Sequence, residues 1–458
     1  MEEIDQIFSS QQDSFSKGFF RPYEARKAAL LKLRRVILKN EQKIVEALYK
    51  DLGKGEFESI ISETLFVIQE IDYTLRKLKK WMRRRRVSTS LLQFPARSYI
   101  LPMPIGPVLV ISPWNYPFQL LLSPAVGAIA AGNNVVMKPS EITPTVSHVI
   151  AKLINDNFAP DFLHVVEGEI PETQALLEKP FAHIFYTGNS QVGKIVMRKA
   201  AENLTPVTLE LGGKSPCLIY GSVNIETVAR RIAWTKFFNA GQTCVAPDYV
   251  LLPKDKKQEF VESITKSLKN FFGEDYGAHT DYGRIVNSRH LERLLSYIEK
   301  DKVAIGGDFN KDDLFLAPTV LEATAESPSM KEEIFGPILP IIEIDSLDDA
   351  ISFVKQRDHP LAAYVYSNDS SVTGKVVDEV LAGGMTVNDC VVHLTSHNLP
   401  FGGVGNSGIG SYHGAQSFEL FSHKKSVLHR GLWLDLPLRY PPYKGKLELL
   451  KKLVSWFS

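Results

Sequence analysis

Cysteine is scarce in this chain, with three copies, Cys217, Cys244 and Cys390, among 458 residues. An odd and sparse set of this kind does not fit the disulfide framework of a small secreted protein. It fits a reducing compartment, so we expect a cytoplasmic protein. At about 150 residues per domain, the length suggests two or three structural units with large buried cores.

Long apolar runs and an excess of charge of one sign are also missing. The N-terminus, MEEIDQIFSS, lacks the basic start and apolar run of a secretion signal, and no later stretch reaches roughly 18 uninterrupted apolar residues. Lys and Arg total 53 against 52 Asp and Glu, a net charge of +1. We therefore expect no transmembrane anchor and no nucleic acid partner. The basic run KKWMRRRR at 79–86 follows a predicted helix, where such charge is usually solvated.

The order of hydrophobic patterns predicts the fold class. From Tyr23 to Met82 apolar residues recur at helical spacing, which predicts an all-helical opening segment. From residue 98 short β-branched runs such as PVLVIS, VVMKPS and HIFYTG alternate with helical ones, and a second series with YVLLP, LPIIEI and AAYVYS follows. This alternation predicts parallel sheets covered by helices. We expect an α/β protein with two Rossmann-like α/β lobes and a small bridging hairpin, of which the extended YILPMPIGP is a candidate strand.

One of the three cysteines lies in an unusual setting. FFNAGQTCVAP at 237–247 places Cys244 among small residues, just after a predicted amphipathic helix. A buried small hydrophobe, a metal ligand and a nucleophile are the three explanations open at this point. Metal ligation lacks partners, because His393 and His397 lie in a predicted loop without a cysteine pair or a neighbouring acid. We predict no metal site.

Two polar residues at predicted strand ends have the character of catalytic groups. In TLELGGKSP, Glu210 lies between Leu209 and Leu211, and desolvation there would raise its pKa toward that of a base working near neutral pH. The alternative is a carboxylate on the exposed face of an alternating strand. In ISPWNYP, Asn115 offers an amide donor for a polarised carbonyl, although turn chemistry explains it as well.

Two further strand ends are candidates for nucleotide binding. MKPSE at 137–141 ends a strand with Lys138 and Glu141, and an acid at this place in a dinucleotide site accepts hydrogen bonds from the ribose. FYTGNSQVGK has Gly188 at a strand end and Gly193 one turn into the next helix, where a phosphate can approach the backbone. An ordinary charged pair and a ligand-free tight turn explain these features too, since GxxxxG is not the GxGxxG fingerprint.

Taken together, these stretches resemble the aldehyde dehydrogenase superfamily. SPWNYP, MKPSE, GNSQVG, LELGGKSP, FNAGQTCVAP, EEIFGP at 332–337 and LPFGGVGNSGIGSYHG at 399–414 fall in the family's order. The short N-terminus and the PFGGVGNSGIGSYHG ending look like the class 3 branch of fatty and aromatic aldehyde dehydrogenases. The turn departs from the commonest pattern, because Ser190 stands where many relatives have threonine, which leaves the cofactor geometry open.

The resemblance implies a role for each matching residue. It makes Cys244 the nucleophile, Glu210 the general base, and Asn115 with the Cys244 backbone N–H the oxyanion site. For NAD or NADP it implies contacts from Lys138, Glu141, Gly188, Ser190, Gly193, Glu333 and Phe335. Candidate walls of the aldehyde pocket are Tyr116, Trp234, Thr395 and Phe401. The reaction implied is NAD(P)-dependent oxidation of an aldehyde to its acid, through a thiohemiacetal and a thioester on the cysteine that water hydrolyses.

The resemblance also implies a homodimer and a division into domains. Residues 1–82 and 101–209 would form the cofactor-binding domain, 210–414 the catalytic domain, and 83–100 and 415–458 the bridging segments. Two other enzymes remain possible from the sequence: a cysteine hydrolase or acyltransferase without redox chemistry, and a CoA-acylating aldehyde dehydrogenase. The last generally lacks the hydrolytic glutamate. The tail GKLELLKKLVSWFS is amphipathic, and packing on the body or on a second subunit is favoured over contact with a membrane surface.

Overall fold

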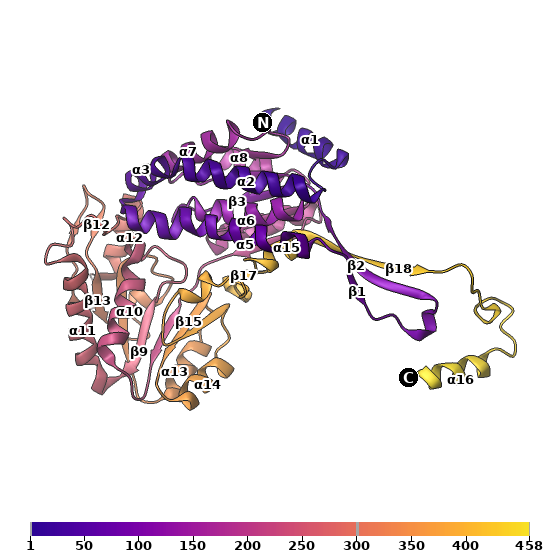
Figure 1. Cartoon of the computed structure of the whole chain (residues 1–458). Coiled ribbons are helices and arrows are strands. Elements are labelled where there is room, and N and C mark those ends of the chain that lie inside the picture. The colour runs from indigo at the N-terminus through magenta and orange to yellow at the C-terminus, as the bar shows by residue number, and fades with distance from the viewer. Residues whose placement is uncertain (1, 299–301, 458) are drawn as a thin grey trace.

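The computed structural model describes residues 2–298 and 302–457, apart from the side chains of Leu92 and residues 453–457. Two α/β bodies lie side by side, and a long arm projects from them (Figure 1). The expected fold class, two α/β lobes with a small hairpin element, is confirmed.

The opening segment is helical, as its periodicity predicts. It covers one face of the first body, at the top of Figure 1. Its helices are α1 (Glu2–Lys17), α2 (Tyr23–Lys39), α3 (Glu41–Leu52), α4 (Glu56–Ser59), a π-helical turn (Ile60–Thr64) and α5 (Leu65–Trp81). Most apolar side chains of α2, α3 and α5 are buried, and these helices pack on α6 (Gln119–Ala131) and α7 (Pro144–Asn155) of the first body.

The first body contains a six-stranded sheet in the order β17-β7-β6-β3-β4-β5. Its strands are β3 (Val108–Ile111), β4 (Val135–Lys138), β5 (Leu163–Val165), β6 (His183–Thr187), β7 (Val207–Glu210) and β17 (Gly408–Ile409). All are parallel except β17, which pairs antiparallel with β7. The helices between them are α6 (Gln119–Ala131), α7 (Pro144–Asn155), α8 (Ile170–Leu177) and α9 (Ser190–Glu202). Strand β3 is buried at every position, which explains its continuous apolar run.

The second body contains a seven-stranded sheet in the order β10-β13-β14-β9-β8-β15-β16. Its strands are β8 (Pro216–Ile219), β9 (Tyr249–Pro253), β10 (Lys302–Ile305), β13 (Thr319–Glu322), β14 (Ile338–Ile344), β15 (Ala362–Tyr366) and β16 (Gly384–Val387). Only the edge strand β10 runs antiparallel to its neighbour. The helices are α10 (Ile225–Phe237), α11 (Lys254–Phe272), α12 (Ser288–Ile298), α13 (Leu347–Lys355) and α14 (Ser370–Glu379), and β11 (Phe309–Asn310) and β12 (Phe315–Leu316) form a separate hairpin.

The arm is a three-stranded antiparallel sheet in the order β1-β2-β18. Its strands are β1 (Arg85–Val87), β2 (Ala96–Pro104) and β18 (Ser422–Arg430), and the chain then runs through an extended tail to α16 (Leu447–Phe457). The hairpin strand expected from YILPMPIGP is β2. Helix α15 (Ala415–Leu420), which precedes β18, packs on α6, and its Phe418 is buried in the core of the first body.

Short turns of 3-10 helix complete the described elements. They are Leu91–Gln93, Phe238–Gly241, Pro328–Met330, Val392–Thr395, Gly405–Ser407 and Pro437–Arg439. Within residues 2–298 and 302–457, no helix combines the length and the apolar character needed to cross a lipid bilayer.

Candidate active site

A cavity lined from both bodies brings the two predicted reactive groups, Cys244 and Glu210, onto one wall. The space between its lining atoms is about 1020 Å³ when the open solvent at its mouth is included. Most of its walls are apolar side chains. The site therefore combines a thiol, a carboxyl group and an apolar surround, as a pocket for a small organic substrate does.

Cys244 follows a sharp change of direction at the end of α10. The 3-10 turn Phe238–Gly241 contains two left-handed residues, Asn239 and Ala240, and a Cβ on Gly241 would lie 2.2 Å from the Gly336 carbonyl oxygen. The turn thus packs tightly against the chain near EEIFGP. Beyond Cys244, the Tyr364 hydroxyl donates to the Val245 carbonyl. The thiol is held by the fold rather than by a flexible loop.

The Cys244 thiol is less acidic than nucleophilic catalysis requires. Burial, with contributions from Glu333 and Glu210, raises its pKa to about 12. The backbone N–H groups of Cys244 and Val245 act in the opposite direction, as expected, but burial outweighs them. Without a further cation nearby, the thiol stays protonated at neutral pH.

Glu210 is the last residue of β7 and is 3% exposed. Neither of its carboxylate oxygens has a hydrogen-bond partner, and burial raises its pKa well above the usual range. The expected direction of this pKa shift is confirmed, and the alternative of an exposed strand face is wrong. A buried carboxyl group without a partner is costly for folding, so its place in the cavity points to a chemical role.

Asn115 is buried but does not line the cavity. Its side-chain Nδ2 donates to the carbonyl of Gln242, 3.0 Å away, two residues before Cys244. An amide nitrogen carries two N–H bonds, so one donor remains beyond this contact. The structure therefore ties Asn115 to the segment that carries the cysteine.

The predicted ribose contacts lie at the carboxyl end of β4. Lys138 is almost completely buried, and its Nζ donates to the Pro139 carbonyl at 2.7 Å and lies 3.6 Å from Glu141 Oε2. The Glu141 side chain is 45% exposed. Burial lowers the pKa of Lys138, while the Glu141 carboxylate raises it. The carboxyl ends of parallel strands are where α/β sheets bind dinucleotides.

The predicted phosphate turn joins β6 to α9. Asn189 caps the helix, because its side chain accepts the Val192 N–H at 2.9 Å. A Cβ on Gly188 would lie 2.3 Å from the Tyr186 hydroxyl, and one on Gly193 would lie 2.9 Å from Leu211 Cδ2. Close packing therefore explains why both positions are glycine, in addition to the expected approach of a phosphate. Ser190 begins α9, and its hydroxyl donates weakly to the Asn406 carbonyl at 3.5 Å.

Glu333 and Phe335 lie on a loop between the turn Pro328–Met330 and β14. Burial raises the pKa of Glu333 to about 8, and its Oε1 has no hydrogen-bond partner. Phe335 has a left-handed backbone, with φ of 51°, and meets the Trp114 ring edge to face at 5.4 Å. A left-handed phenylalanine is an uncommon conformation, which the surrounding structure enforces.

The residues present fit a bound dinucleotide. Buried polar atoms without a partner include the Glu210 carboxylate oxygens, Glu333 Oε1 and Thr187 Oγ1, and Glu210 and Thr187 share the cavity wall. The charges of Glu210 and Glu333 both raise the pKa of the Cys244 thiol, which indicates that the three groups lie near one another. A polar ligand would satisfy such orphaned groups.

All four candidate pocket residues, Tyr116, Trp234, Thr395 and Phe401, lie on the cavity wall. Sequence reasoning missed much of the rest, and nearness to a recognised motif was a signal for only some of these residues. The wall residues it did not name include Ile61, Ser62, Phe66, Val391, Leu394, Tyr412 and His413. Ile61, Ser62 and Phe66 come from the opening helical segment, far in sequence from every motif.

The two histidines weighed as metal ligands have other partners. His393 Nδ1 bonds Thr386 Oγ1 at 2.9 Å, and His397 Nδ1 lies 2.8 Å from Glu70 Oε2. In the described part of the chain, no group of three or more His, Cys, Asp or Glu side chains is placed to hold a metal ion.

Comparisons with known proteins identify relatives of this chain. The model of the aldehyde dehydrogenase family matches residues 1–427. The chain is 45% identical to 4,4'-diaponeurosporen-aldehyde dehydrogenase of Staphylococcus aureus, over 98% of this chain and 99% of that protein. It is 47% identical to the dimeric NADP-preferring aldehyde dehydrogenase of Mus musculus, with the same shares covered.

Solved structures show the same fold. The substrate-bound state of Staphylococcus aureus AldH has a TM-score of 0.96 at 44% identity, covering 98% of this chain and 99% of that one. A Mycobacterium tuberculosis aldehyde dehydrogenase complexed with NAD+ has a TM-score of 0.85 at 27% identity, covering 95% and 91%.

Proposed function

The chain belongs to the aldehyde dehydrogenase family and oxidises aldehydes to acids with NAD(P), and we propose that it does so through Cys244, Glu210 and Asn115. One observation carries this assignment: Cys244 and Glu210 share one apolar cavity, in which neither oxygen of the Glu210 carboxyl group has a partner.

Cys244 acts first, as the nucleophile. Its thiol loses its proton to solvent, which a bound cationic nicotinamide would favour, and the resulting thiolate adds to the aldehyde carbon. The negative charge that develops on the aldehyde oxygen needs hydrogen-bond donors. The second N–H of the Asn115 amide and the backbone N–H of Cys244 supply them, and each such donor is worth roughly 10²–10³ in rate. A bound nicotinamide supplies the acceptor for the hydride that this adduct loses.

Glu210 acts afterwards, as the general base. Burial raises its pKa well above the usual range, so its carboxylate is a stronger base than an exposed one. It accepts a proton from the water that attacks the thioester on Cys244, and the acid product leaves. The apolar walls keep competing water away from the reacting carbon.

The cofactor contacts follow the strand ends and the loop of Glu333. Lys138 and Glu141 hold the adenosine ribose, the turn of Gly188, Ser190 and Gly193 the pyrophosphate, and Glu333 with Phe335 the second ribose. The half-exposed Glu141 carboxylate has room to turn away from a 2′-phosphate, so both NAD and NADP should be accepted.

The substrate is an apolar aldehyde with a long or aromatic body. Tyr116, Trp234, Thr395 and Phe401 lie on the cavity wall, and apolar side chains dominate it. The Staphylococcus aureus relative, whose name states 4,4'-diaponeurosporen-aldehyde as its substrate, supports an apolar aldehyde of this kind.

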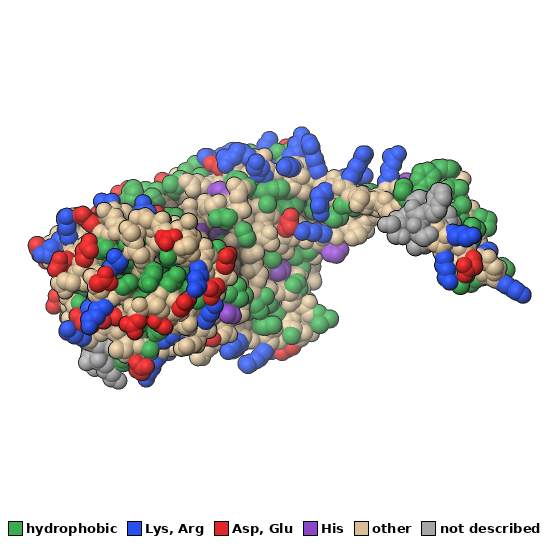
Figure 2. Space-filling model, turned by 90° about the horizontal axis from the view of Figure 1, so that it is seen from below, with side chains coloured by type: hydrophobic (Ala, Val, Ile, Leu, Met, Phe, Trp, Pro, Cys, Tyr) green, Lys and Arg blue, Asp and Glu red, His purple; other side chains and the backbone are tan. Residues whose placement is uncertain are grey.

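The enzyme is a homodimer in the cytoplasm. The mouse relative is named as dimeric. The tail beyond β18 exposes apolar side chains that a second copy would cover, among them Leu432 (98% exposed) and Trp433 (72%). Figure 2 shows Lys and Arg side chains gathered along the neck of this arm, whereas both signs of charge alternate over the bodies. All three cysteines are free thiols, as in a reducing compartment.

A panel of aldehydes with NAD and with NADP tests the reaction. Reduced cofactor should appear with stoichiometric acid, fastest for long-chain or aromatic aldehydes. Release of acid from an ester substrate alone, with no reduced cofactor from any aldehyde, would instead support a cysteine hydrolase or acyltransferase. A strict requirement for CoA would support the CoA-acylating alternative.

A further inference from the structure

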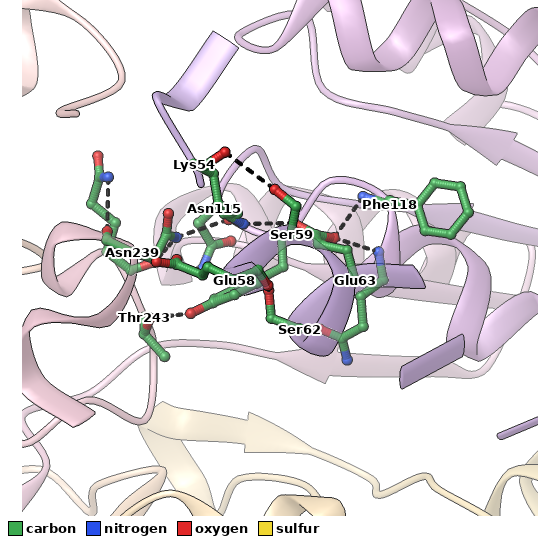
Figure 3. Close-up of polar contacts among 12 residues, drawn as sticks. Lys54, Glu58, Ser59, Ser62, Glu63, Asn115, Phe118, Asn239 and Thr243 are labelled. Atoms are coloured by element: carbon green, nitrogen blue, oxygen red, sulfur yellow. Dashed lines mark hydrogen bonds and ion pairs between the residues drawn. The ribbon is translucent and has the colours of Figure 1, made fainter. Parts of the chain in front are cut away.

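A fully buried ion pair lies next to the candidate active site without lining its cavity. Lys54, between α3 and α4, meets Glu63 of the π-helical turn at 2.7 Å, and both side chains are 0% exposed (Figure 3). Burying two charges costs several kcal/mol per ion, and such a pair is weak evidence for stability by itself. Its remaining contacts indicate what it does.

Both members of the pair hold the turn that carries Asn115. Glu63 Oε2 accepts the N–H groups of Phe118 at 3.2 Å and Gln119 at 2.8 Å, where α6 begins. Lys54 Nζ donates to the backbone carbonyl of Asn115 at 3.1 Å. It also lies 4.2 Å from the centre of the Tyr116 ring, a cation–π distance. The turn 115–119 is therefore fixed from one side by charge-assisted bonds.

The other side of the same turn faces the segment that ends in Cys244. Asn239 Nδ2 donates to the Asn115 carbonyl at 2.9 Å, and the Tyr116 hydroxyl shares a hydrogen bond of 2.6 Å with Thr243 Oγ1. The Asn115 amide bonds the Gln242 carbonyl in this segment as well. Figure 3 shows Asn115 between the ion pair and Asn239.

The π-helical turn serves both purposes at once. Its Ile61 and Ser62 line the cavity, whereas its Glu63 points at the turn of Asn115. A π-helical turn has one more residue per hydrogen-bonded ring than an α-helix and is found mostly at functional sites. Here it lets neighbouring residues face the substrate and the oxyanion donor.

We propose that Lys54 and Glu63 are positioning residues for aldehyde oxidation, which hold the Asn115 backbone so that its amide lies beside Cys244. This rests on the proposed role of Asn115 as an oxyanion donor. A displacement of about 1 Å at such a donor costs on the order of 10²-fold in rate. The charges, rather than neutral groups, give the turn two strong anchors in a dry interior.

The double variant Lys54→Met/Glu63→Gln tests the proposal, because it removes both charges of the pair, so that neither member is left without its partner. We expect kcat to fall about 10- to 100-fold, while the KM for aldehyde and for cofactor changes by less than about threefold. The control is Arg34→Met/Asp72→Asn, which removes a half-exposed ion pair between α2 and α5 and should leave kcat unchanged. A kcat equal to that of the wild type in the folded test variant would overturn the proposal.

A double-mutant cycle with Asn115→Ala separates positioning from general damage. If the pair acts through Asn115, removing it lowers kcat by less than about threefold when Asn115 is already alanine. If the losses in kcat from the two changes are instead additive, the pair is purely structural and the proposal is overturned. Should Asn115→Ala alone keep full kcat, the oxyanion role fails and this proposal with it. A slow Asn115→Ala enzyme with an unaffected pair variant refutes the positioning alone. The variant Lys54→Gln/Glu63→Gln keeps a neutral donor and runs the same cycle if the methionine variant does not fold.

Discussion

At the residue scale, burial disfavours the charged form of both reacting groups. It raises the pKa of Cys244 to about 12 and that of Glu210 well above its usual range. The Glu210 carboxylate also raises the pKa of the Cys244 thiol, since like charges near one another are unfavourable. A cation bound between them would lower the pKa of both. The reactivity of the thiol and of the carboxyl group therefore depends on whether a cationic ligand is bound in the site.

The two proposed roles of Cys244 and Glu210 predict different kinetic losses. Cys244→Ser should abolish detectable turnover, because no thiohemiacetal forms. Glu210→Gln should give a burst of about one equivalent of reduced cofactor, followed by turnover roughly 10²–10⁴ slower, because the thioester forms but water is not activated. Stopped-flow absorbance of the reduced cofactor measures both. Cys217→Ala, which alters a buried thiol of β8, is the control; full turnover in either test variant would refute its assigned role.

Glu58 predicts a dependence of stability on pH. Burial raises its pKa to about 7, and its Oε1 has no partner. A carboxyl group whose folded pKa is raised stabilises the fold below its unfolded pKa near 4.5 and loses that contribution as pH rises through 7. The loss is of order 2–3 kcal/mol.

Urea unfolding at pH 5 and pH 8 checks this expectation. Glu58→Gln should be more stable than the wild type at pH 8 by about 1–3 kcal/mol and nearly equal to it at pH 5. The comparison with the wild type cancels the opposite trend of His183, His393 and His413, whose burial lowers their pKa to about 4. An equal difference at both pH values would contradict the assignment.

At the element scale, the loop of Glu333 and Phe335 is fixed by charged side chains from two other segments. Lys214, four residues after Glu210, donates to the carbonyls of Ser329 at 2.8 Å and Glu332 at 2.9 Å and pairs with Asp248. Asp248, four residues after Cys244, accepts the Ile334 N–H at 3.0 Å. The pair thus joins the segments of the base, the nucleophile and the cofactor loop.

Loosening this loop should weaken cofactor binding. In Lys214→Met/Asp248→Asn we expect the KM for NAD(P) to rise about tenfold, because ordering the loop then costs binding energy, with a smaller change in the KM for aldehyde. Steady-state kinetics with each substrate varied measures this. Lys257→Met, which removes surface pairs with Glu322 and Glu343, is the control. An equal rise in both KM values would point to general damage instead.

At the scale of the whole molecule, the arm is the part whose surface least suits a monomer. Its edge strand β18 leaves one side unpaired, and the tail beyond it exposes Leu432, Trp433 and Tyr443. Open strand edges and clustered apolar side chains are typical of surfaces that a partner covers. Figure 1 shows the arm standing clear of both bodies.

Sedimentation equilibrium tests the dimer. The mass should be twice the 51.3 kDa of the chain. Deletion after Arg430 removes the exposed apolar tail and should raise the dissociation constant of the dimer at least about tenfold. Deletion after Arg439 keeps Leu432 and Trp433 and should raise it less. A monomer at micromolar concentration, or flotation of the full chain with anionic liposomes but not of the deletion variants, would contradict this role of the tail.

The sequence by itself determined the fold class and predicted the reactive residues. Helical and strand periodicities are short-range signals, and motifs such as FNAGQTC and LELGG place their chemistry within a few residues. Raised proton affinity at Glu210 followed from its two leucine neighbours. These inferences needed no knowledge of how distant segments meet.

Only the tertiary structure decided which distant residues support the site. Lys54 meets the Asn115 carbonyl across 61 residues, and the Asn115 amide meets Gln242 across 127. The raised pKa of Cys244 likewise comes from burial and from Glu333. The backbone N–H groups beside the thiol lower this pKa, but not enough to offset those effects. The physical reason is that burial and long-range pairing depend on how whole elements pack, and neither periodicity nor a local motif encodes that packing.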